Sequence, residues 1–196
     1  MILYIHGFAS SGEGAKATLF KTLACNHPVY APSLSNIPDL AIQTLSECIT
    51  LCKKSEDPLF STVHIIGSSL GGYYAHYLAY KYRLKAVLIN PALYPYNRLS
   101  SYEGMVKNYY DNSHFECHVT HFEMLKKYDV PATVENDNIL LLSQKGDEVL
   151  DYREAVGKLG GATMMVQDGG DHTFENITDY LDAIGTFLHV RFGGMS

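Results

Sequence analysis

The fold is decided by the stretch from Val63 to Tyr82, which reads VHIIGSSLGGYYAHYLAYKY. A strand-like apolar run passes into the pattern G-x-S-x-G over residues 67–71, and a helix-like segment follows over 70–82. A strand that enters a helix through so tight a turn needs small residues on both sides of the serine, and the turn lifts the Ser69 hydroxyl clear of the sheet. A plain glycine–serine loop is the alternative, and the strand–turn–helix context favours the tight turn.

On both sides of this stretch, short apolar runs alternate with longer segments of helical periodicity. The runs are nearly continuous in Ile, Val, Leu and Tyr, which is typical of parallel strands covered on both faces. The predicted strands are 2–6, 28–31, 62–67, 85–90, 138–143 and 162–167. The predicted helices are 14–25, 38–54, 70–82, 150–160 and 177–190. This alternation predicts an α/β fold with a doubly wound, mostly parallel six-stranded sheet and right-handed crossovers.

One segment interrupts the alternation. Residues 91–137 separate two predicted strands by far more than a crossover helix needs, and they are rich in Tyr and His. We expect this insertion to form a small, mostly helical cap over the carboxyl edge of the sheet. The whole chain, 1–196, has the length of a single domain.

A serine hydroxyl becomes a good nucleophile when a base removes its proton and a carboxylate orients the base. In a sheet of this kind, both partners follow later strands, in the chain order serine, acid, histidine. Asp147 comes soon after the strand 138–143, and His172 lies in a glycine-rich loop after the strand 162–167. The order Ser69, Asp147, His172 therefore predicts a catalytic triad.

Alternatives stay open for two of these residues. Asp147 could be a solvated turn residue, with Glu148 or Asp151 as the true partner of the base. His172 could be an ordinary loop histidine, although no other histidine stands at a strand end beyond Ser69.

Backbone N–H groups near the serine are candidates for stabilising an oxyanion. Leu70 opens the predicted helix, and Phe8 lies in the loop after the first strand, so we expect their N–H groups to form the oxyanion hole. His6 is more simply explained as a tether of that loop than as a catalytic group. Ser10 and Ser11 either line the entrance to the site or cap the helix that follows.

Composition excludes several classes of protein. Lys plus Arg number 15 against 21 for Asp plus Glu, and this net charge of −6 without a dense basic run argues against a nucleic-acid partner. No apolar stretch approaches the roughly 20 residues that span a bilayer, so we expect no membrane partner. The N-terminus lacks the basic segment of a signal peptide, and a cytoplasmic location is the expectation.

The distribution of metal-binding residue types gives little sign of a metal. The four cysteines are scattered without a CxxC pair, which argues against a disulfide framework or a zinc site. His114, His118 and His121, with Cys117 beside them, would share one face of a helix, which permits a metal site. A solvated or locally packed face of the cap is the simpler interpretation, and we expect neither a metal nor an organic cofactor.

Five longer segments carry a further signal. They read LYIHGFASS (3–11), IIGSSLGGYYA (65–75), INPALYPYN (89–97), QKGDEVLDYREAV (144–156) and GGDHTFENITDYL (169–181). In these segments the chain resembles the YqiA-type small bacterial α/β-hydrolases, a group of esterases. The resemblance implies an α/β-hydrolase sheet without the first two strands of larger relatives. It also implies hydrolysis of short acyl esters, with acyl-CoA thioesters as a further candidate. Some relatives lack the serine at the turn, so the presence of Ser69 favours activity.

We therefore expect hydrolysis of carboxylic esters of short to medium acyl chain through an acyl-enzyme, with a small-molecule acyl ester as the partner. The alternatives are a small peptidase or C–C hydrolase on the same triad, and a non-catalytic binding module. The apolar side chains of the cap either line an acyl pocket or form the cap's own core. They are several tyrosines with Met105, Phe115, Phe122 and Met124. The oligomeric state does not follow from the sequence.

Overall fold

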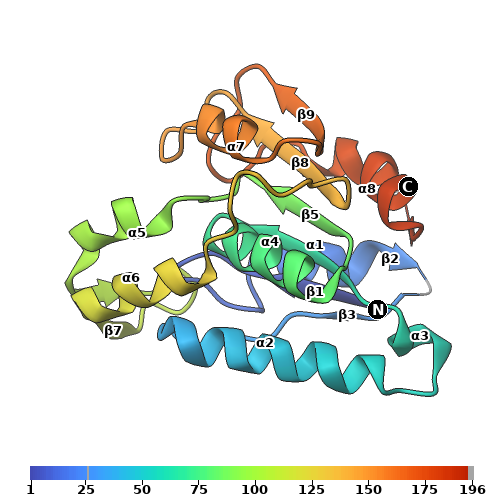
Figure 1. The fold of residues 1–196 in the computed structure, drawn as a ribbon, viewed down its shortest axis with the longest axis horizontal. Coiled ribbons are helices and arrows are strands. Elements are labelled where there is room, and N and C mark those ends of the chain that lie inside the picture. The colour runs from blue at the N-terminus through green and yellow to red at the C-terminus, as the bar shows by residue number, and fades with distance from the viewer. Residues whose placement is uncertain (26, 194–196) are drawn as a thin grey trace.

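The computed structural model describes residues 1–25 and 27–193 and confirms the doubly wound α/β fold (Figure 1). A six-stranded sheet of order β3-β1-β4-β5-β8-β9 forms its centre, and every neighbouring pair of strands is parallel. The strands are β1 (Ile2–Ile5), β3 (Val29–Tyr30), β4 (His64–Ser68), β5 (Ala86–Ile89), β8 (Ile139–Gln144) and β9 (Thr163–Gln167). Their bounds agree closely with the predicted ones, and the largest shift moves the start of β4 from 62 to 64.

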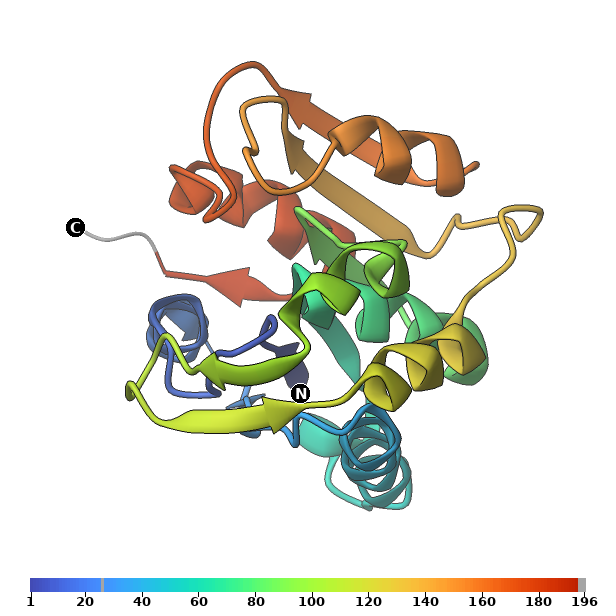
Figure 2. The same ribbon diagram turned by 90° about the vertical axis from the view of Figure 1, so that its left-hand side faces the viewer.

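Helices cover both faces of this sheet (Figures 1 and 2). One face carries α2 (Pro38–Lys53), α4 (Leu70–Tyr82) and α7 (Tyr152–Lys158), and the other carries α1 (Ala15–Leu23) and α8 (Leu181–Leu188). Two short helices, α3 (Pro58–Ser61) and η3 (Ile177–Tyr180), come before β4 and α8. Successive side chains of a strand point to opposite faces, so Ile65 packs with α2 and α4 whereas Ile66 packs with α1 and α8.

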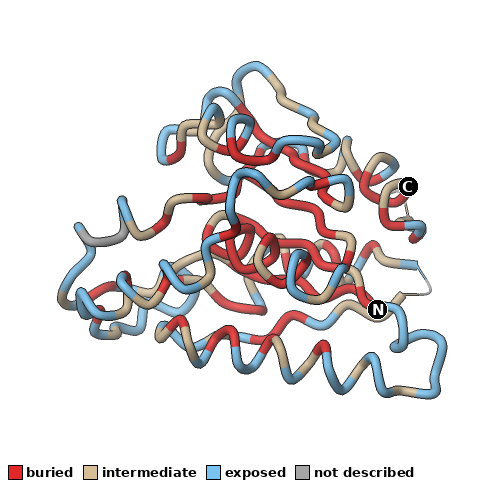
Figure 3. Tube along the Cα trace, in the orientation of Figure 1, coloured by how far each residue is buried: buried red, intermediate tan, exposed pale blue. Residues whose placement is uncertain are grey.

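The helix α2 illustrates how the sequence forms these layers. It begins with Pro38 and Asp39, two residue types that suit the first turn of a helix. Ala41, Leu45 and Ile49 recur every four residues and are fully buried, so one stripe of the helix faces the sheet. The same pattern across the other helices concentrates the buried residues between the layers (Figure 3).

The cap over 91–137 contains a β-hairpin that was not predicted. Its helical segments are α5 (Pro95–Arg98), η1 (Leu99–Tyr102), α6 (Val119–Leu125) and η2 (Lys126–Tyr128). Between η1 and α6, the antiparallel strands β6 (Gly104–Lys107) and β7 (His114–Cys117) form the hairpin. Val106 and Cys117 are buried while Met105 and Glu116 are exposed, which is the two-residue period of a strand. The expectation of a mostly helical cap was therefore wrong for this part, because four residues are too few for that period to stand out.

A second small sheet was also missed. The strands β2 (Ala24–Cys25) and β10 (Arg191–Phe192) pair antiparallel and join the end of α1 to the end of the described chain. Two residues carry no recognisable periodicity, so this pairing depends on the packing of the surrounding helices rather than on a local pattern.

Candidate active site

The turn between β4 and α4 has the geometry that the G-x-S-x-G pattern predicts. Ser69 stands directly before α4 with φ +56° and ψ −122°, a strained backbone conformation for a residue with a side chain. A Cβ on Gly67 would lie 2.3 Å from the Gly71 carbonyl oxygen, and one on Gly71 would lie 2.0 Å from the Ile5 carbonyl oxygen. Both flanking positions therefore require glycine for β1, β4 and α4 to approach this closely.

Three predicted side chains meet at this turn. The Ser69 Oγ lies 3.1 Å from His172 Nε2, and His172 Nδ1 lies 2.9 and 3.0 Å from the two carboxylate oxygens of Asp147. With Nδ1 protonated, the imidazole donates to Asp147 and accepts the Ser69 hydroxyl proton at Nε2. Residues 69, 147 and 172 are far apart in the chain, yet each follows a strand of one parallel sheet and so reaches the same edge.

The Asp147 carboxylate is held in an ionised, fixed position. Its side chain is 2% exposed, and its Oδ1 accepts hydrogen bonds from the N–H groups of Val149 and Leu150 at 2.9 and 2.8 Å. Burial by itself raises the pKa of the Asp147 carboxyl, but the hydrogen bonds from His172 and from the Leu150 N–H outweigh it and hold the pKa below its ordinary value. An anion at this point favours the Nδ1-protonated imidazole and stabilises an imidazolium.

The other two acidic candidates do not contact the imidazole. Glu148 is exposed, and its Oε2 accepts the backbone N–H of His172 at 3.0 Å. Asp151 stands before α7, accepts the Arg153 N–H at 2.9 Å and pairs with the Arg153 guanidinium. Of the three carboxylates, only Asp147 therefore lies where it can orient His172 through the ring.

The two predicted oxyanion donors lie beside Ser69. Phe8 and Leu70 both line the cleft that contains Ser69. Within the described part of the chain, neither backbone N–H donates to a protein acceptor, which leaves both available to a ligand. The loop of Phe8 is tethered by His6, whose Nδ1 lies 2.8 Å from the Gly7 carbonyl oxygen and whose Nε2 accepts the Leu34 N–H at 3.0 Å.

Two buried amides, not predicted as site residues, hold the loop that carries His172. Asn90, at the end of β5, is 3% exposed and adopts φ +39°, which asparagine tolerates better than most residues. Its Nδ2 donates to the carbonyl oxygens of Asp171 and His172 at 2.9 and 3.3 Å. Its Oδ1 accepts the N–H of Gln144 at 2.9 Å. Asn90 therefore joins the ends of β5 and β8 to the His172 loop.

The second amide, Gln144, is fully buried at the end of β8. Its Oε1 accepts the N–H groups of Asp171 and Glu175 at 3.1 and 2.9 Å, and its Nε2 donates to the Glu175 carbonyl at 2.9 Å. A Cβ on Gly170, which has φ +74°, would lie 2.1 Å from Gln144 Oε1. We name Asn90 and Gln144 the amide clamp. Its only sequence signal is that both residues end an apolar strand with a polar side chain.

The cleft around Ser69 has a volume of about 620 Å³, within the usual range of small-molecule sites. The cap contributes Pro95, Arg98, Tyr102 and Tyr109 to its wall. The other apolar cap residues divide between two roles: Phe122 is buried in the core shared with α2 and α4, whereas Met105 is 67% exposed. Two tyrosines of the cap therefore line the cleft, whereas its other tyrosines and the four phenylalanines and methionines are not among the lining residues.

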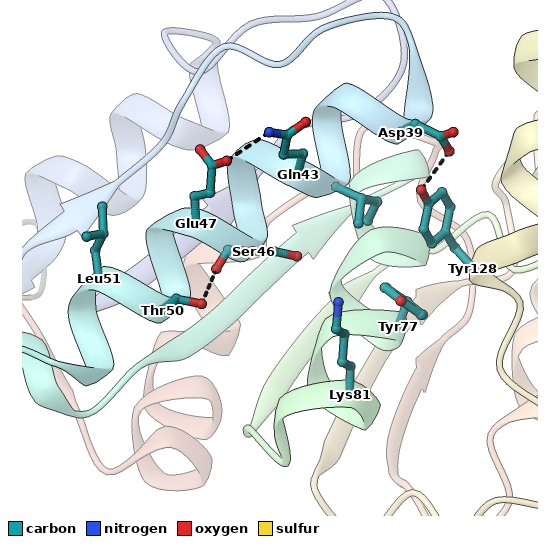
Figure 4. A pocket seen from close by; sticks show the side chains of 10 residues that line it. Asp39, Gln43, Ser46, Glu47, Thr50, Leu51, Tyr77, Lys81 and Tyr128 are labelled. Carbon is teal, nitrogen blue, oxygen red and sulfur yellow. Dashed lines mark hydrogen bonds between the residues drawn. The ribbon is translucent and has the colours of Figure 1, made fainter.

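A second hollow, of about 710 Å³, lies between α2 and α4 and is bordered by Tyr128 of the cap (Figure 4). Asp39 at its end accepts hydrogen bonds from the Tyr128 hydroxyl and the Lys127 ammonium, each at 2.6 Å. Along α2, Gln43 donates to Glu47 at 2.9 Å. No histidine is among the described residues that line this hollow, so Ser46 has no imidazole base there.

The histidines of the cap do not share a helix face. His114 lies on β7, His118 stands before α6, and His121 lies in the first turn of α6. Across the described residues, no group of three or more His, Cys, Asp or Glu side chains is close enough to hold a metal ion. In the same part of the chain, no helix has the length and apolar character needed to cross a bilayer.

Comparison with solved structures shows the same fold in known proteins. The chain is similar to Est1E from Butyrivibrio proteoclasticus, with a TM-score of 0.67 and 14% identity over 96% of this chain and 86% of that one. It is also similar to the monoacylglycerol lipase of Paleococcus ferrophilus, with a TM-score of 0.68 and 14% identity over 95% of this chain and 93% of that one. The fold is therefore that of the α/β-hydrolases, as the sequence resemblance implied.

Comparison of sequences identifies the family. The UPF0227 protein YcfP of Salmonella paratyphi A is 28% identical over 192 residues, which cover 95% of this chain and 98% of the relative. The model of UPF0227, described as an uncharacterised protein family, matches residues 1–189. Because this match spans nearly the whole chain, the protein belongs to the UPF0227 family.

Proposed function

We propose that the protein is a serine hydrolase that cleaves carboxylic esters of short to medium acyl chain by way of an acyl-enzyme. The single observation that carries this proposal is the relay from Ser69 Oγ through His172 to the buried Asp147. Such a relay has one evident chemical use, which is to raise the nucleophilicity of a hydroxyl that is otherwise protonated at neutral pH.

In the proposed reaction, Ser69 attacks the ester carbonyl while His172 Nε2 takes the hydroxyl proton. The N–H groups of Phe8 and Leu70 stabilise the oxyanion, and each is expected to contribute about 3–4 kcal/mol to lowering the barrier. The imidazolium returns its proton to the leaving alcohol as the tetrahedral intermediate collapses to the acyl-enzyme. His172 then activates water, and a second tetrahedral intermediate releases the acid and restores the Ser69 hydroxyl.

The cleft favours small substrates that are apolar over part of their length. It is lined by Tyr102 and Tyr109 of the cap and by Val149 and Leu150 after β8. An acyl chain that extends from Ser69 along these side chains would leave water on burial, which favours binding. Thioesters of the same acyl groups place the same carbonyl at Ser69 and are therefore candidate substrates as well.

A fluorophosphonate probe tests the nucleophile directly, because the activated hydroxyl displaces fluoride and forms a stable phosphonyl ester. We expect one adduct by mass spectrometry, located on Ser69 and absent from Ser69→Ala. Ser61→Ala is the matched control, since Ser61 is exposed on α3 and is not among the residues that line the cleft. An unlabelled wild-type protein would support the binding module instead. An adduct that persists in a folded Ser69→Ala variant would place the reactive nucleophile on another residue and contradict the proposed triad.

A substrate panel tests the reaction class. We expect 4-nitrophenyl esters with two to eight acyl carbons, or the matching thioesters, to be hydrolysed with a higher kcat/KM than aminoacyl 4-nitroanilides. Faster cleavage of the anilides would replace the esterase proposal by the peptidase alternative, since both reactions use the same triad.

A further inference from the structure

Lys16 places a positive charge inside the candidate active-site cleft. It lies in the first turn of α1 and lines the cleft together with Ser69 and His172. The residue is half-buried, whereas a lysine on the outer face of a surface helix normally keeps its ammonium in water. Lys16 is thus a basic side chain of the cleft wall.

Lys16 has no polar partner among the described residues, and in this it differs from the other lysines that contact the protein. Those with a hydrogen bond or an ion pair are Lys21, Lys53, Lys85, Lys126, Lys127, Lys145 and Lys158. Lys54, Lys81 and Lys107 are exposed and are therefore solvated. Among the lysines of the described residues, Lys16 is therefore the one that is partly buried and has neither a hydrogen bond nor an ion pair.

The second cation at the cleft is already neutralised. The Arg98 guanidinium donates to Glu154 at 2.9 Å and to the Val149 carbonyl at 3.2 Å. An incoming anion would have to compete with Glu154 for Arg98, but it would meet no competitor at Lys16. The positive charge of the cleft wall that has no ion pair among the described residues therefore lies on the α1 side.

Two acidic residues lie nearby, and one of them, Glu148, also lines the cleft. Their hydrogen bonds are to their own loop. Glu148 accepts the backbone N–H of His172, and Asp171 accepts the Thr173 hydroxyl at 2.7 Å. Neither carboxylate forms an ion pair with Lys16, although Asp171 acts on it from a longer distance. Burial lowers the pKa of the Lys16 ammonium, and Asp171 opposes that effect only in part, so an additional anion would stabilise the charged form.

We propose that the cleft takes ester substrates that carry an anionic group, a carboxylate or a phosphate, and that Lys16 binds this group. The inference rests on the proposed esterase function and names the substrate class of the same site. A substrate anion would gain a charge-assisted hydrogen bond from the Lys16 ammonium, which has no acceptor among the described residues. Lys16 is then a specificity-determining residue, and the anion fixes the orientation of the ester relative to Ser69.

Matched substrates test whether the charge is recognised and on which side of the ester it lies. For the acyl side, the pair is mono-4-nitrophenyl adipate and its neutral methyl ester. For the alcohol side, the butyryl esters of glycolate and of 2-hydroxyethyl phosphate are compared with that of neutral glycolamide. The measured quantity is the ratio of kcat/KM for the anionic substrate to kcat/KM for the neutral one.

We expect at least one anionic arm to show a ratio that falls by about tenfold or more in Lys16→Met, the range of a hydrogen bond to a charged group. Lys16→Arg keeps the charge and is expected to retain most of the ratio. Lys54→Met removes an exposed lysine outside the cleft and is the control for net charge. The substrate pair whose ratio falls shows whether the anion lies on the acyl or the alcohol side of the ester. It also shows whether that anion is a carboxylate or a phosphate.

Two results overturn the inference, and they are distinguishable. If the wild-type protein hydrolyses the neutral esters but the ratios in Lys16→Met and Lys54→Met equal those of the wild type, Lys16 does not bind an anion and the esterase proposal stands. If the wild-type protein hydrolyses none of the five esters and takes no fluorophosphonate, the proposed function fails and the inference fails with it.

Discussion

The loop that carries His172 and the hairpin of the cap both border the cleft, but the structure holds them differently. The His172 loop is fixed through its backbone, because the amide clamp of Asn90 and Gln144 bonds carbonyl and N–H groups on both sides of the histidine. The hairpin contacts the loop after β1 through two hydrogen bonds. The Tyr109 N–H donates to the Ala9 carbonyl at 2.8 Å, and Asn108 Nδ2 donates to the Ser10 carbonyl at 3.3 Å.

The His172 loop and the hairpin also differ in how far the residues that hold them are buried. The clamp residues are 3% and 0% exposed, whereas Tyr109 and Tyr110 at the hairpin tip are 71% and 52% exposed. The cap is anchored at its other end, where the buried Tyr73 hydroxyl donates to the Leu125 carbonyl at 2.6 Å. A buried hydrogen bond costs more to break than an exposed one, so we expect the loop to stay in place while the hairpin opens. We therefore expect the candidate reacting groups to be preorganised and the hairpin side of the cleft wall to be adjustable.

The largest expected effect tests the fixed side. Asp147→Asn keeps the size of the side chain but removes the negative charge and favours the wrong imidazole tautomer, so kcat should fall by about 10⁴-fold. Steady-state hydrolysis of a 4-nitrophenyl ester measures this loss. Glu148→Gln is the matched control, because it neutralises the neighbouring carboxylate that does not contact the ring. A loss of this size in Glu148→Gln, with only a small loss in Asp147→Asn, would show that Glu148 and not Asp147 orients His172.

The amide clamp is the next test. Asn90→Gly keeps the left-handed backbone without strain and removes only the side-chain amide, which leaves the buried Gln144 N–H without its acceptor. We expect the free energy of unfolding to fall by about 1–3 kcal/mol. We also expect kcat to fall by up to about 100-fold, since a shift of about 1 Å in a catalytic group has such an effect.

A structural role alone would lower stability without a matching loss of kcat. Asn138→Ala gives that reference, because Asn138 Nδ2 also donates to a backbone carbonyl, that of Leu84, at the opposite end of β8. Thermal unfolding and kcat are measured on both variants at a temperature where each is folded. Equal losses of kcat in the two variants would contradict a positioning role for Asn90.

The two regions also differ in how much of them could be predicted from the sequence. The reason is whether a local pattern reports the contacts that form them. Ser69, Asp147 and His172 each follow a strand, so a pattern of apolar runs is enough to bring them to one edge. The bonds of Asn90 join residues 81 and 82 positions apart, and no local pattern reports such contacts. Likewise, the hairpin strands of the cap are too short to show a period, and the unpaired charge of Lys16 depends on which loops surround it.

A smaller expected effect, again at the triad, is the contribution of Asp147 to the pH dependence of the unfolding free energy. The folded-state pKa of Asp147 is below the unfolded value of about 3.9, so its ionised form stabilises the protein above that pH and this contribution is lost as the pH falls through the folded pKa. We therefore expect the difference in unfolding free energy between the wild type and Asp147→Asn to narrow from pH 7 to pH 3. Chemical denaturation at both pH values measures it. A difference that widens on acidification would mean that the folded state raises this pKa.

The smallest expected effect tests the adjustable side. Asn108→Ala removes one of the two hydrogen bonds that join the hairpin to the loop after β1, and also the bond within the tip that Asn108 Oδ1 accepts from the Tyr110 N–H at 2.8 Å. A single neutral bond of about 1 kcal/mol between hairpin and loop corresponds to at most about a fivefold change. Because the hairpin borders the cleft but does not hold the triad, the change should appear in KM for octanoyl esters, whose chains are long enough to reach the cap. The kcat for acetyl esters should stay within about twofold of the wild type. Lys107→Ala is the control, because it changes an exposed side chain of β6 without removing a hydrogen bond between the hairpin and the loop after β1. If Asn108→Ala lowered kcat for acetyl and octanoyl esters alike, the hairpin would belong with the His172 loop among the parts that position the reacting groups, and the division drawn between the two regions would be wrong.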